Sequence, residues 1–395
     1  MRDFVYYAPT KVVFGRRAEE KAGELLREFG AKKVLIHYGG KSAVQSGLID
    51  RVRRSAEDAG MTCVLLGGVQ PNPRVSLVRE GVALCRKEGV DFILAVGGGS
   101  VIDSAKAIAF GISHDFDVWD LFAKKEQASA CCPVGAVLTI AAAGSEMSGT
   151  SVITNEETGM KRGYSSALCR PKFAIMNPEL TFTLPPYQTA SGATDILMHI
   201  MERYFYGADL GSCDLTDGMA ESAMRTVMAC VKTVLADPCH YDARAEIMWA
   251  SSLAHNDLLH CGNGSRGDWA CHQMEHELGA MFDVAHGAGL AAVWGSWARY
   301  VWRHAPRRFY LFAIRVMEVK PGDEESTVLA GIEAFEQFLR EIGMPTNIRA
   351  LGIRLTEEQM DTLSYGCTYG HTRTVGSVVV MEEEEIREVY ALARG

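Results

Sequence analysis

Two histidine-containing segments of the chain carry residue types that bind first-row divalent metals. Asp195 and His199 stand four residues apart, and His272 and His276 repeat that spacing further along the chain. On a helix, residues four apart lie on one face, about one turn from each other. A further histidine, His286, follows in the sequence Val-Ala-His-Gly. One carboxylate with two or three imidazoles is a ligand set suited to Fe²⁺ or Zn²⁺.

The neighbours of these residues favour an inward-facing site. Polar pairs four residues apart also occur on exposed helix faces, where they bind nothing. Here the flanking residues are apolar: Ile196, Leu197, Ile200 and Met201 around the first pair, and Trp269, Met274, Leu278, Met281 and Phe282 around the second. Histidines among such neighbours need polar partners, and a metal ion satisfies several at once. Spacing alone leaves open whether His272 or His276 is a ligand.

Composition narrows the class of protein. The chain has 395 residues, enough for two domains with a large core, and its net charge of −9 without a basic block argues against nucleic-acid binding. Its eleven cysteines contain no Cys-x-x-Cys motif, which is typical of reduced thiols in the cytoplasm. The first residues do not form a signal peptide, and the longest apolar run, residues 133–144, is too short to span a membrane.

The expected secondary structure divides the chain near residue 186. Up to that point, apolar strands (33–37, 62–66 and 92–96) alternate with helices (18–29, 47–59 and 76–88), and residues 4–14 are predicted to form two short strands broken at Pro9. This alternation indicates a parallel sheet covered on both faces. Six later segments have helical periodicity: 191–206, 215–235, 243–259, 269–282, 287–302 and 326–342. We therefore predict an α/β, Rossmann-like dinucleotide-binding domain over 1–186 and an all-helical metal-binding and catalytic domain over 187–395.

A glycine-rich turn follows the predicted strand 92–96. It reads Gly97-Gly98-Gly99-Ser100 and opens a helix that contains Asp103 and Lys106. Glycines allow backbone N–H groups to close on an anion, and the helix N-terminus adds partial positive charge. Because nucleotides bind at the carboxyl ends of such strands, the turn predicts a dinucleotide site. The alternative is a tight turn without a ligand, with Asp103 only a first-turn residue and Lys106 a solvated one.

The earlier turn, after strand 33–37, bears on the choice of dinucleotide. An NAD-specific site usually holds the ribose 2′-hydroxyl with an acidic residue at a strand end. The chain has Gly39, Gly40, Lys41 and Ser42 there instead, which would admit and neutralise a 2′-phosphate. We therefore predict a preference for NADP(H) over NAD(H). The alternative is an ordinary Gly-Gly turn.

Several motifs together resemble a known family. They lie at residues 8–15 (Ala-Pro-Thr-Lys-Val-Val-Phe-Gly), 69–73 (Val-Gln-Pro-Asn-Pro), 97–106, 138–146, 177–185, Asp195-x3-His199 and His272-x3-His276-x9-His286-Gly287. With these motifs the chain resembles the iron-containing (group III) alcohol dehydrogenases over nearly its full length, in particular the NADPH-dependent butanol dehydrogenase and aldehyde reductase branch. The resemblance implies the two-domain architecture that dehydroquinate synthase shares.

The resemblance also assigns roles to residues. It implies that the metal ligands are Asp195, His199, His272 and His286, with Fe²⁺ as the expected ion and Zn²⁺ or Mn²⁺ also suited to the set. His276 would then stand beside the open coordination position, where it either relays a proton or only shapes the pocket. The implied nucleotide contacts are Gly39, Gly40, Gly98, Gly99, Ser100, Asp103, Thr139 and Lys161. For Lys161 the alternative is a surface lysine beside Arg162, and Ala143 replaces the threonine that usually precedes Gly-Ser-Glu.

The expected reaction is reversible hydride transfer between NADP(H) and a primary alcohol or aldehyde, with a small apolar substrate favoured by the apolar neighbours of the site. The family also implies a homodimer, formed through the N-terminal strands.

Two alternatives to this reaction are a sugar-phosphate cyclase and a structural metal module. A dehydroquinate synthase-like sugar-phosphate cyclase would need several basic residues near the ligands, where only Arg203 and Arg266 lie close in sequence. A structural metal module would have a closed, cysteine-rich site, and Cys261 and Cys271 lack that spacing.

Overall fold

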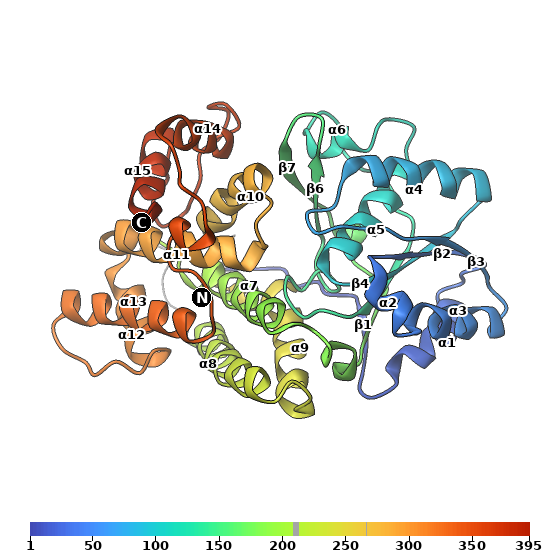
Figure 1. The fold of residues 1–395 in the computed structure, drawn as a ribbon, viewed down its shortest axis with the longest axis horizontal. Coiled ribbons are helices and arrows are strands. Elements are labelled where there is room, and N and C mark those ends of the chain that lie inside the picture. Colours follow the sequence, from blue (N-terminus) through green and yellow to red (C-terminus); the bar gives the residue numbers. More distant parts are fainter. Residues whose placement is uncertain (208–212, 266) are drawn as a thin grey trace. The chain divides into compact units, whose positions relative to one another are not determined.

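A six-stranded parallel sheet organises residues 7–183 (Figure 1). The structure is a computed structural model that describes residues 1–207, 213–265 and 267–395, so Arg266 lies outside the described residues. The strand order is β1-β8-β5-β4-β2-β3. The strands are β1 (Lys11–Phe14), β2 (Lys33–Tyr38), β3 (Thr62–Leu66), β4 (Phe92–Gly97), β5 (Val134–Leu138) and β8 (Phe173–Met176).

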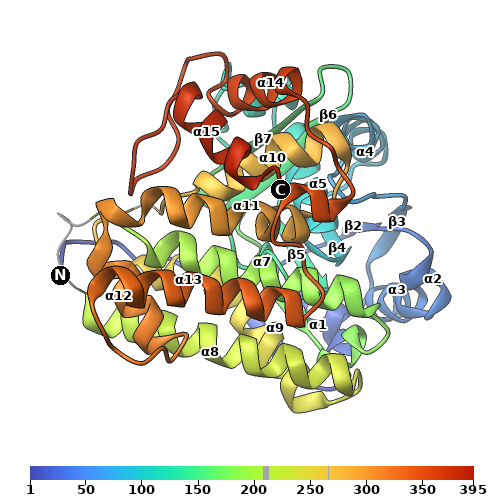
Figure 2. The same ribbon diagram turned by 60° about the vertical axis from the view of Figure 1, so that its left-hand side comes forward.

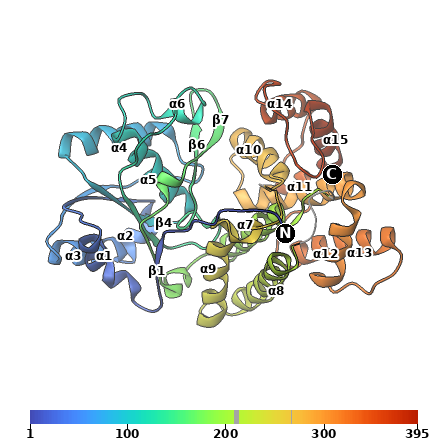
Figure 3. The same cartoon turned by 180° about the vertical axis from the view of Figure 1, so that it is seen from behind.

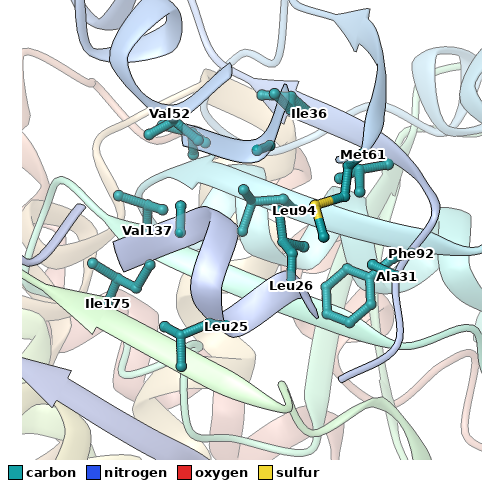
Figure 4. Packing of buried hydrophobic residues seen from close by; sticks show 14 of the residues in the cluster. Leu25, Leu26, Ala31, Ile36, Val52, Met61, Phe92, Leu94, Val137 and Ile175 are labelled. Carbon is teal, nitrogen blue, oxygen red and sulfur yellow. The ribbon is translucent and has the colours of Figure 1, made fainter. Parts of the chain in front are cut away.

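Helices cover both faces of this sheet, as the apolar strands predict. On one face, α1 (Ala22–Glu28) and α3 (Leu48–Asp58) pack Leu26 and Val52 against a core that includes Ile36 and Leu94 (Figure 4). On the other face lie α4 (Val75–Glu88) and α5 (Gly99–Ile112), as Figure 1 shows. Because both faces are covered, every residue of β4 and β5 is buried. The short helices η1 (Ala18–Lys21), α2 (Lys41–Gln45), α6 (Trp119–Phe122), η2 (Ala167–Cys169) and η3 (Pro178–Thr181) complete this unit.

Two details of this unit differ from the sequence prediction. Of the two strands predicted within 4–14, only the second forms, as β1 (Lys11–Phe14), which pairs with β8. The residues before Pro9 form no strand, because no described strand pairs with them. An antiparallel hairpin, β6 (Thr150–Asn155) with β7 (Met160–Ser165), was not predicted. Its turn includes Gly159, whose φ of 67° lies in the left-handed region that glycine adopts readily.

The second unit, residues 184–395 together with residues 1–6, is helical (Figure 2). Over its described residues from 187 on, the only β-type pairing is an isolated bridge between Val375 and Met381. The backbone N–H of Arg2 donates to the carbonyl of Gly262 over 2.8 Å, which ties the N-terminal residues to this unit (Figure 3). The long helices are α7 (Pro186–Tyr204), α8 (Asp214–Ala236), α9 (Tyr241–His255), α10 (Ala270–Phe282), α11 (His286–Val301), α12 (Pro306–Arg315), α13 (Glu324–Glu341), α14 (Glu357–Cys367) and α15 (Glu383–Ala393).

The six predicted helices correspond to α7, α8, α9, α10, α11 and α13, with ends shifted by a few residues. Helices α12 and α14 were not predicted, because each is short and its apolar pattern covers only two or three turns. Short single-turn helices η5 (Leu258–His260), η6 (Trp302–His304) and η7 (Ile348–Leu351) join the longer ones. Among the described helices, none combines the length and the apolar character that crossing a bilayer requires.

Candidate functional site

Helix α7 carries the first pair of proposed ligands. Pro186 occupies its first position, where the missing N–H costs nothing, and Asp195 and His199 follow on a stretch that is buried from Gly192 to Tyr204. Helix α10 presents His272 and His276, and His286 is the first residue of α11. The start of α11 approaches α7 closely. A Cβ on Gly287 would lie 2.0 Å from the backbone oxygen of Ser191, so only glycine permits this approach.

Three imidazole nitrogens surround one carboxylate oxygen. Asp195 Oδ1 lies 3.4 Å from His199 Nε2, 3.6 Å from His286 Nε2 and 3.7 Å from His272 Nε2. Two atoms bound at about 2.1 Å to one tetrahedral metal ion lie about 3.4 Å apart. Asp195 Oδ1 and His272 Nε2 are buried and have no hydrogen-bond partner among the described residues. A divalent cation therefore fits these donors, since it would satisfy atoms that are otherwise costly to bury.

The donors fall into two overlapping groups. Donor atoms of Asp195, His272 and His286 all lie within 4.8 Å of one another, and those of Glu275, His276 and His286 do so as well. His199 is close to Asp195 but belongs to neither group. The rings of His276 and His286 stack with centroids 5.9 Å apart. The structure thus brings all five sequence-predicted residues of the metal site together, with His276 to one side of the Asp195 cluster.

The electrostatics of the cluster favour a cation. Burial lowers the pKa of His199 well below its usual value, and the positive charges of His255, His272 and Arg203 lower it further, so this imidazole stays neutral and keeps the lone pair of one ring nitrogen. Burial alone would also lower the pKa of His272, but Asp195 and Glu202 outweigh it and raise that pKa to about 9. The position between these carboxylates therefore attracts positive charge, which a metal ion supplies in place of a proton.

Two contacts of the histidines were not foreseen from sequence. His272 Nδ1 donates to Glu202 Oε1 over 2.9 Å, and His286 Nδ1 donates to Glu275 Oε2. Glu202 follows Asp195 by seven residues and His199 by three, so helical spacing could have found it on the same face of α7. Glu275 has no comparable signal, because its partner lies on the next helix.

The glycine-rich turns lie at adjacent strand ends. Strands β2 and β4 are neighbours, and the chain leaves β2 for β3 on one side and β4 for β5 on the other. Gly39 and Gly98 therefore flank the topological switch point, where doubly wound sheets bind nucleotides. Thr139 follows β5, and its N–H donates to the carbonyl of Gly97 over 3.1 Å. The sequence-predicted residues 39, 40, 42, 98–100 and 139 thus lie at neighbouring carboxyl ends, whereas the side chain of Lys41 lies outside the described part of the structure.

The glycines of these turns serve different purposes. A Cβ on Gly97 would lie 2.4 Å from Val101 Cγ2, so glycine is needed there for packing. A Cβ on Gly40 would meet nothing within 4 Å, so glycine leaves open space beside the turn. Helix α5 begins at Gly99, and the N–H groups of Gly99 and Ser100 belong to its first turn, where helical backbone lacks internal acceptors.

Two lysines are buried, contrary to the surface alternatives. Lys106 is fully buried, and its Nζ donates to the carbonyl oxygens of Ser145 (2.7 Å), Ser148 (3.0 Å) and Thr150 (2.8 Å). The solvated reading of Lys106 is therefore wrong, because only the folded loop supplies these acceptors. Lys161 on β7 is only 5% exposed, so its surface alternative is wrong too.

Asp103 also forms hydrogen bonds with this loop. Its Oδ1 accepts a hydrogen bond from Ser145 Oγ over 2.5 Å, and its Oδ2 accepts one from the N–H of Val152 over 2.9 Å. Asp103 and Lys106 together anchor residues 145–152 to α5. Asp103 is therefore more than a first-turn helix residue.

Comparisons with known proteins show the family. The family model for iron-containing alcohol dehydrogenase matches residues 9–178, and the model for the C-terminal part of the same family matches residues 189–393. The chain belongs to the iron-containing alcohol dehydrogenase family. It is 42% identical over 366 residues to the probable NADH-dependent butanol dehydrogenase 1 of Bacillus subtilis, covering 92% of this chain and 93% of that protein. It is 35% identical to the NADPH-dependent aldehyde reductase YqhD of Escherichia coli, covering 89% and 90%.

Solved structures show the same fold. The crystal structure of an NADH-dependent butanol dehydrogenase A from Thermotoga maritima matches with a TM-score of 0.96 at 40% identity, over 100% of this chain and 99% of that one. The predicted family, the two-part fold and the reaction class are confirmed. The protein is an NAD(P)-dependent alcohol or aldehyde oxidoreductase with an iron-type metal, and the cyclase alternative is set aside. The predicted NADP(H) preference is not confirmed, because several similar butanol dehydrogenases are named as NADH-dependent.

Proposed function

We propose that this protein is a butanol dehydrogenase-like enzyme that interconverts small apolar primary alcohols and aldehydes in the cytoplasm, with a preference for NADP(H). In this proposal residues 1–186 bind the dinucleotide, and residues 187–395 hold the metal and the reacting groups. One observation carries it: three imidazole nitrogens within 3.7 Å of a buried, otherwise unpartnered carboxylate oxygen of Asp195. That arrangement suits one divalent cation.

The proposed ligands are Asp195, His199, His272 and His286, with Fe²⁺ as the family's metal. When bound, the cation supplies Lewis acidity toward the C–O group of the substrate, and the nicotinamide carries the hydride. Because helices α7, α10 and α11 are packed elements of one unit, they hold these donors in place without rearrangement. The ring of His276 stacks on that of His286, and in this proposal His276 either moves a proton at the substrate oxygen or only shapes the pocket.

For the dinucleotide we propose contacts from Gly39, Gly40, Lys41, Ser42, Gly98, Gly99, Ser100, Asp103, Thr139 and Lys161. The first-turn N–H groups of α5 would bind the pyrophosphate. Asp103 would act through the loop that it anchors at Ser145 and Val152. The open space at Gly40 would accommodate a 2′-phosphate, and this supports the NADP(H) preference.

Replacing Gly40 with aspartate tests the cofactor preference. We expect the wild-type enzyme to have a higher kcat/KM with NADPH than with NADH, and Gly40→Asp to lower the NADPH value about tenfold or more, because a carboxylate would repel the 2′-phosphate. The new side chain fits, since Gly40 has a φ of −83° and nothing within 4 Å of a Cβ. Steady-state kinetics with both cofactors measure the ratio.

A matched control is Gly218→Asp, at a glycine of α8 that also has open space around it. It should leave the cofactor ratio unchanged. A clear NADH preference of the wild-type enzyme would contradict the proposal on the cofactor and leave the reaction class intact.

We also propose a homodimer formed through the N-terminal segment. Strand β1 lies at the edge of the sheet, and the residues before it are apolar and exposed, including Phe4, Tyr7 and Val5, the last with 94% exposure. Exposed apolar edges are more stable when paired. Light scattering at micromolar concentration should give twice the chain mass, and Val5→Asp should shift the population toward monomer. A monodisperse wild-type monomer would refute this part of the proposal.

A further inference from the structure

Two buried carboxylates each accept a hydrogen bond from one of the proposed histidine ligands. Glu202 accepts a hydrogen bond from His272 Nδ1, and Glu275 accepts one from His286 Nδ1. An imidazole that donates through Nδ1 presents its Nε2 lone pair on the opposite side of the ring. In both histidines that Nε2 is the atom close to Asp195 Oδ1. We infer that Glu202 and Glu275 are positioning residues that fix the tautomer and ring orientation of His272 and His286 and so set the metal affinity; this inference rests on the proposed ligation.

Glu202 acts on both the ring and the backbone of the second ligand segment. Its Oε1 also accepts from the backbone N–H of His272 over 3.2 Å, and its Oε2 accepts from the N–H of Trp269 over 2.5 Å. These N–H groups lie at the N-terminus of α10, where a negative charge is favourable. One side chain of α7 therefore binds both the N-terminus of α10 and the ring of His272.

Glu275 reaches its partner through space that a glycine leaves free. It is fully buried on α10, while His286 opens α11. A Cβ on Gly289, one turn after His286, would lie 2.8 Å from Glu275 Cγ. The first turn of α11 thus lacks a side chain where the carboxylate passes. This is an independent sign that the chain is built to place Glu275 against His286.

The two carboxylates also change the charge of the cluster. With Asp195 they place three carboxylates at the proposed cation site, and a carboxylate partner would make each imidazole a better donor to the cation. Replacing glutamate by glutamine removes the charge and keeps both the size and an accepting oxygen. Glu202→Gln and Glu275→Gln are therefore expected to weaken metal binding by about 10- to 100-fold each while the fold is retained.

The experiment measures the affinity of the full-length protein for Zn²⁺ and Co²⁺ by competition with a chelator. The visible spectrum of the Co²⁺ form reports the ligand geometry directly, and thermal unfolding of each metal-free variant reports the fold. The matched control is Glu221→Gln. Glu221 is a buried carboxylate of the same unit. It accepts hydrogen bonds from the hydroxyl of Tyr204 over 2.9 Å and from Arg315 over 3.3 Å, and neither of these residues is a proposed ligand.

For Glu202→Gln and Glu275→Gln we expect an about 10- to 100-fold loss of metal affinity and a changed Co²⁺ spectrum. For Glu221→Gln we expect a metal affinity within twofold of wild type. If the wild-type protein binds one metal ion and both variants bind it equally well, the inference is overturned and the proposed function stands. A wild-type protein that binds no stoichiometric metal overturns both. If Glu202→Gln does not fold, Glu275→Gln alone decides the inference.

Discussion

Replacing Asp195 with alanine is expected to abolish metal binding and activity together. Asp195 supplies the oxygen that three imidazole nitrogens approach within 3.4–3.7 Å, and it is the sole carboxylate in the proposed ligand set. Without it, the Nε2 atoms of His199, His272 and His286 lose the carboxylate oxygen that they approach. Because Lewis acidity contributes several kcal/mol to stabilising the transition state, we expect kcat/KM for butanal reduction to fall by about 10³-fold or more.

The measurement pairs metal analysis of the purified variant with its steady-state kinetics. His286→Ala should behave in the same way, since it removes a second ligand from a different helix. Asp242→Ala, at an exposed carboxylate in the first turn of α9, serves as the control and should retain both metal and activity. Full activity in metal-free Asp195→Ala would show that the ligation is wrong.

Replacing His276 with alanine is expected to separate proton transfer from metal binding. His276 lies beside His286, with ring centroids 5.9 Å apart, but it is not among the three residues grouped around Asp195 Oδ1. The variant should therefore keep its metal. General acid–base groups contribute about 10²- to 10⁴-fold, so kcat should fall by that factor if His276 moves the proton at the substrate oxygen.

Chemical rescue distinguishes a relay from a residue that only shapes the pocket. Added imidazole should restore part of the lost kcat in His276→Ala, because it can occupy the vacated volume and carry the proton. His304→Ala, at an exposed histidine far along the chain, is the control and should not respond. Unchanged kcat and an unchanged pH profile in His276→Ala would exclude the relay.

The residues of the proposed metal site could be found in the sequence because helical spacing and chemistry agree. Asp195 and His199 on α7, and His272 and His276 on α10, lie where a period of four residues predicts them. Spacing left the choice between His272 and His276 open. In the structure His272 Nε2 lies 3.7 Å from Asp195 Oδ1, whereas His276 groups with Glu275 and His286, and these distances depend on how the helices pack.

Other contacts, in both units, were harder to predict because they join segments that are distant in the sequence. The sequence around Lys106 is compatible with a solvated side chain, yet the loop at 145–150 supplies three carbonyl oxygens to its buried ammonium group. Glu275 interacts with a histidine on the next helix, and no local pattern indicates that direction. The parallel strands, by contrast, were evident from their continuous apolar runs, since strands covered on both faces have no polar side.

The most direct test of the account is a crystal structure of the iron-loaded protein with anomalous scattering measured at the iron absorption edge. The account predicts one strong peak about 2.0–2.2 Å from Asp195 Oδ1 and from the Nε2 atoms of His199, His272 and His286. A peak elsewhere in the chain, or a peak bound by His276 in place of His272, would contradict it.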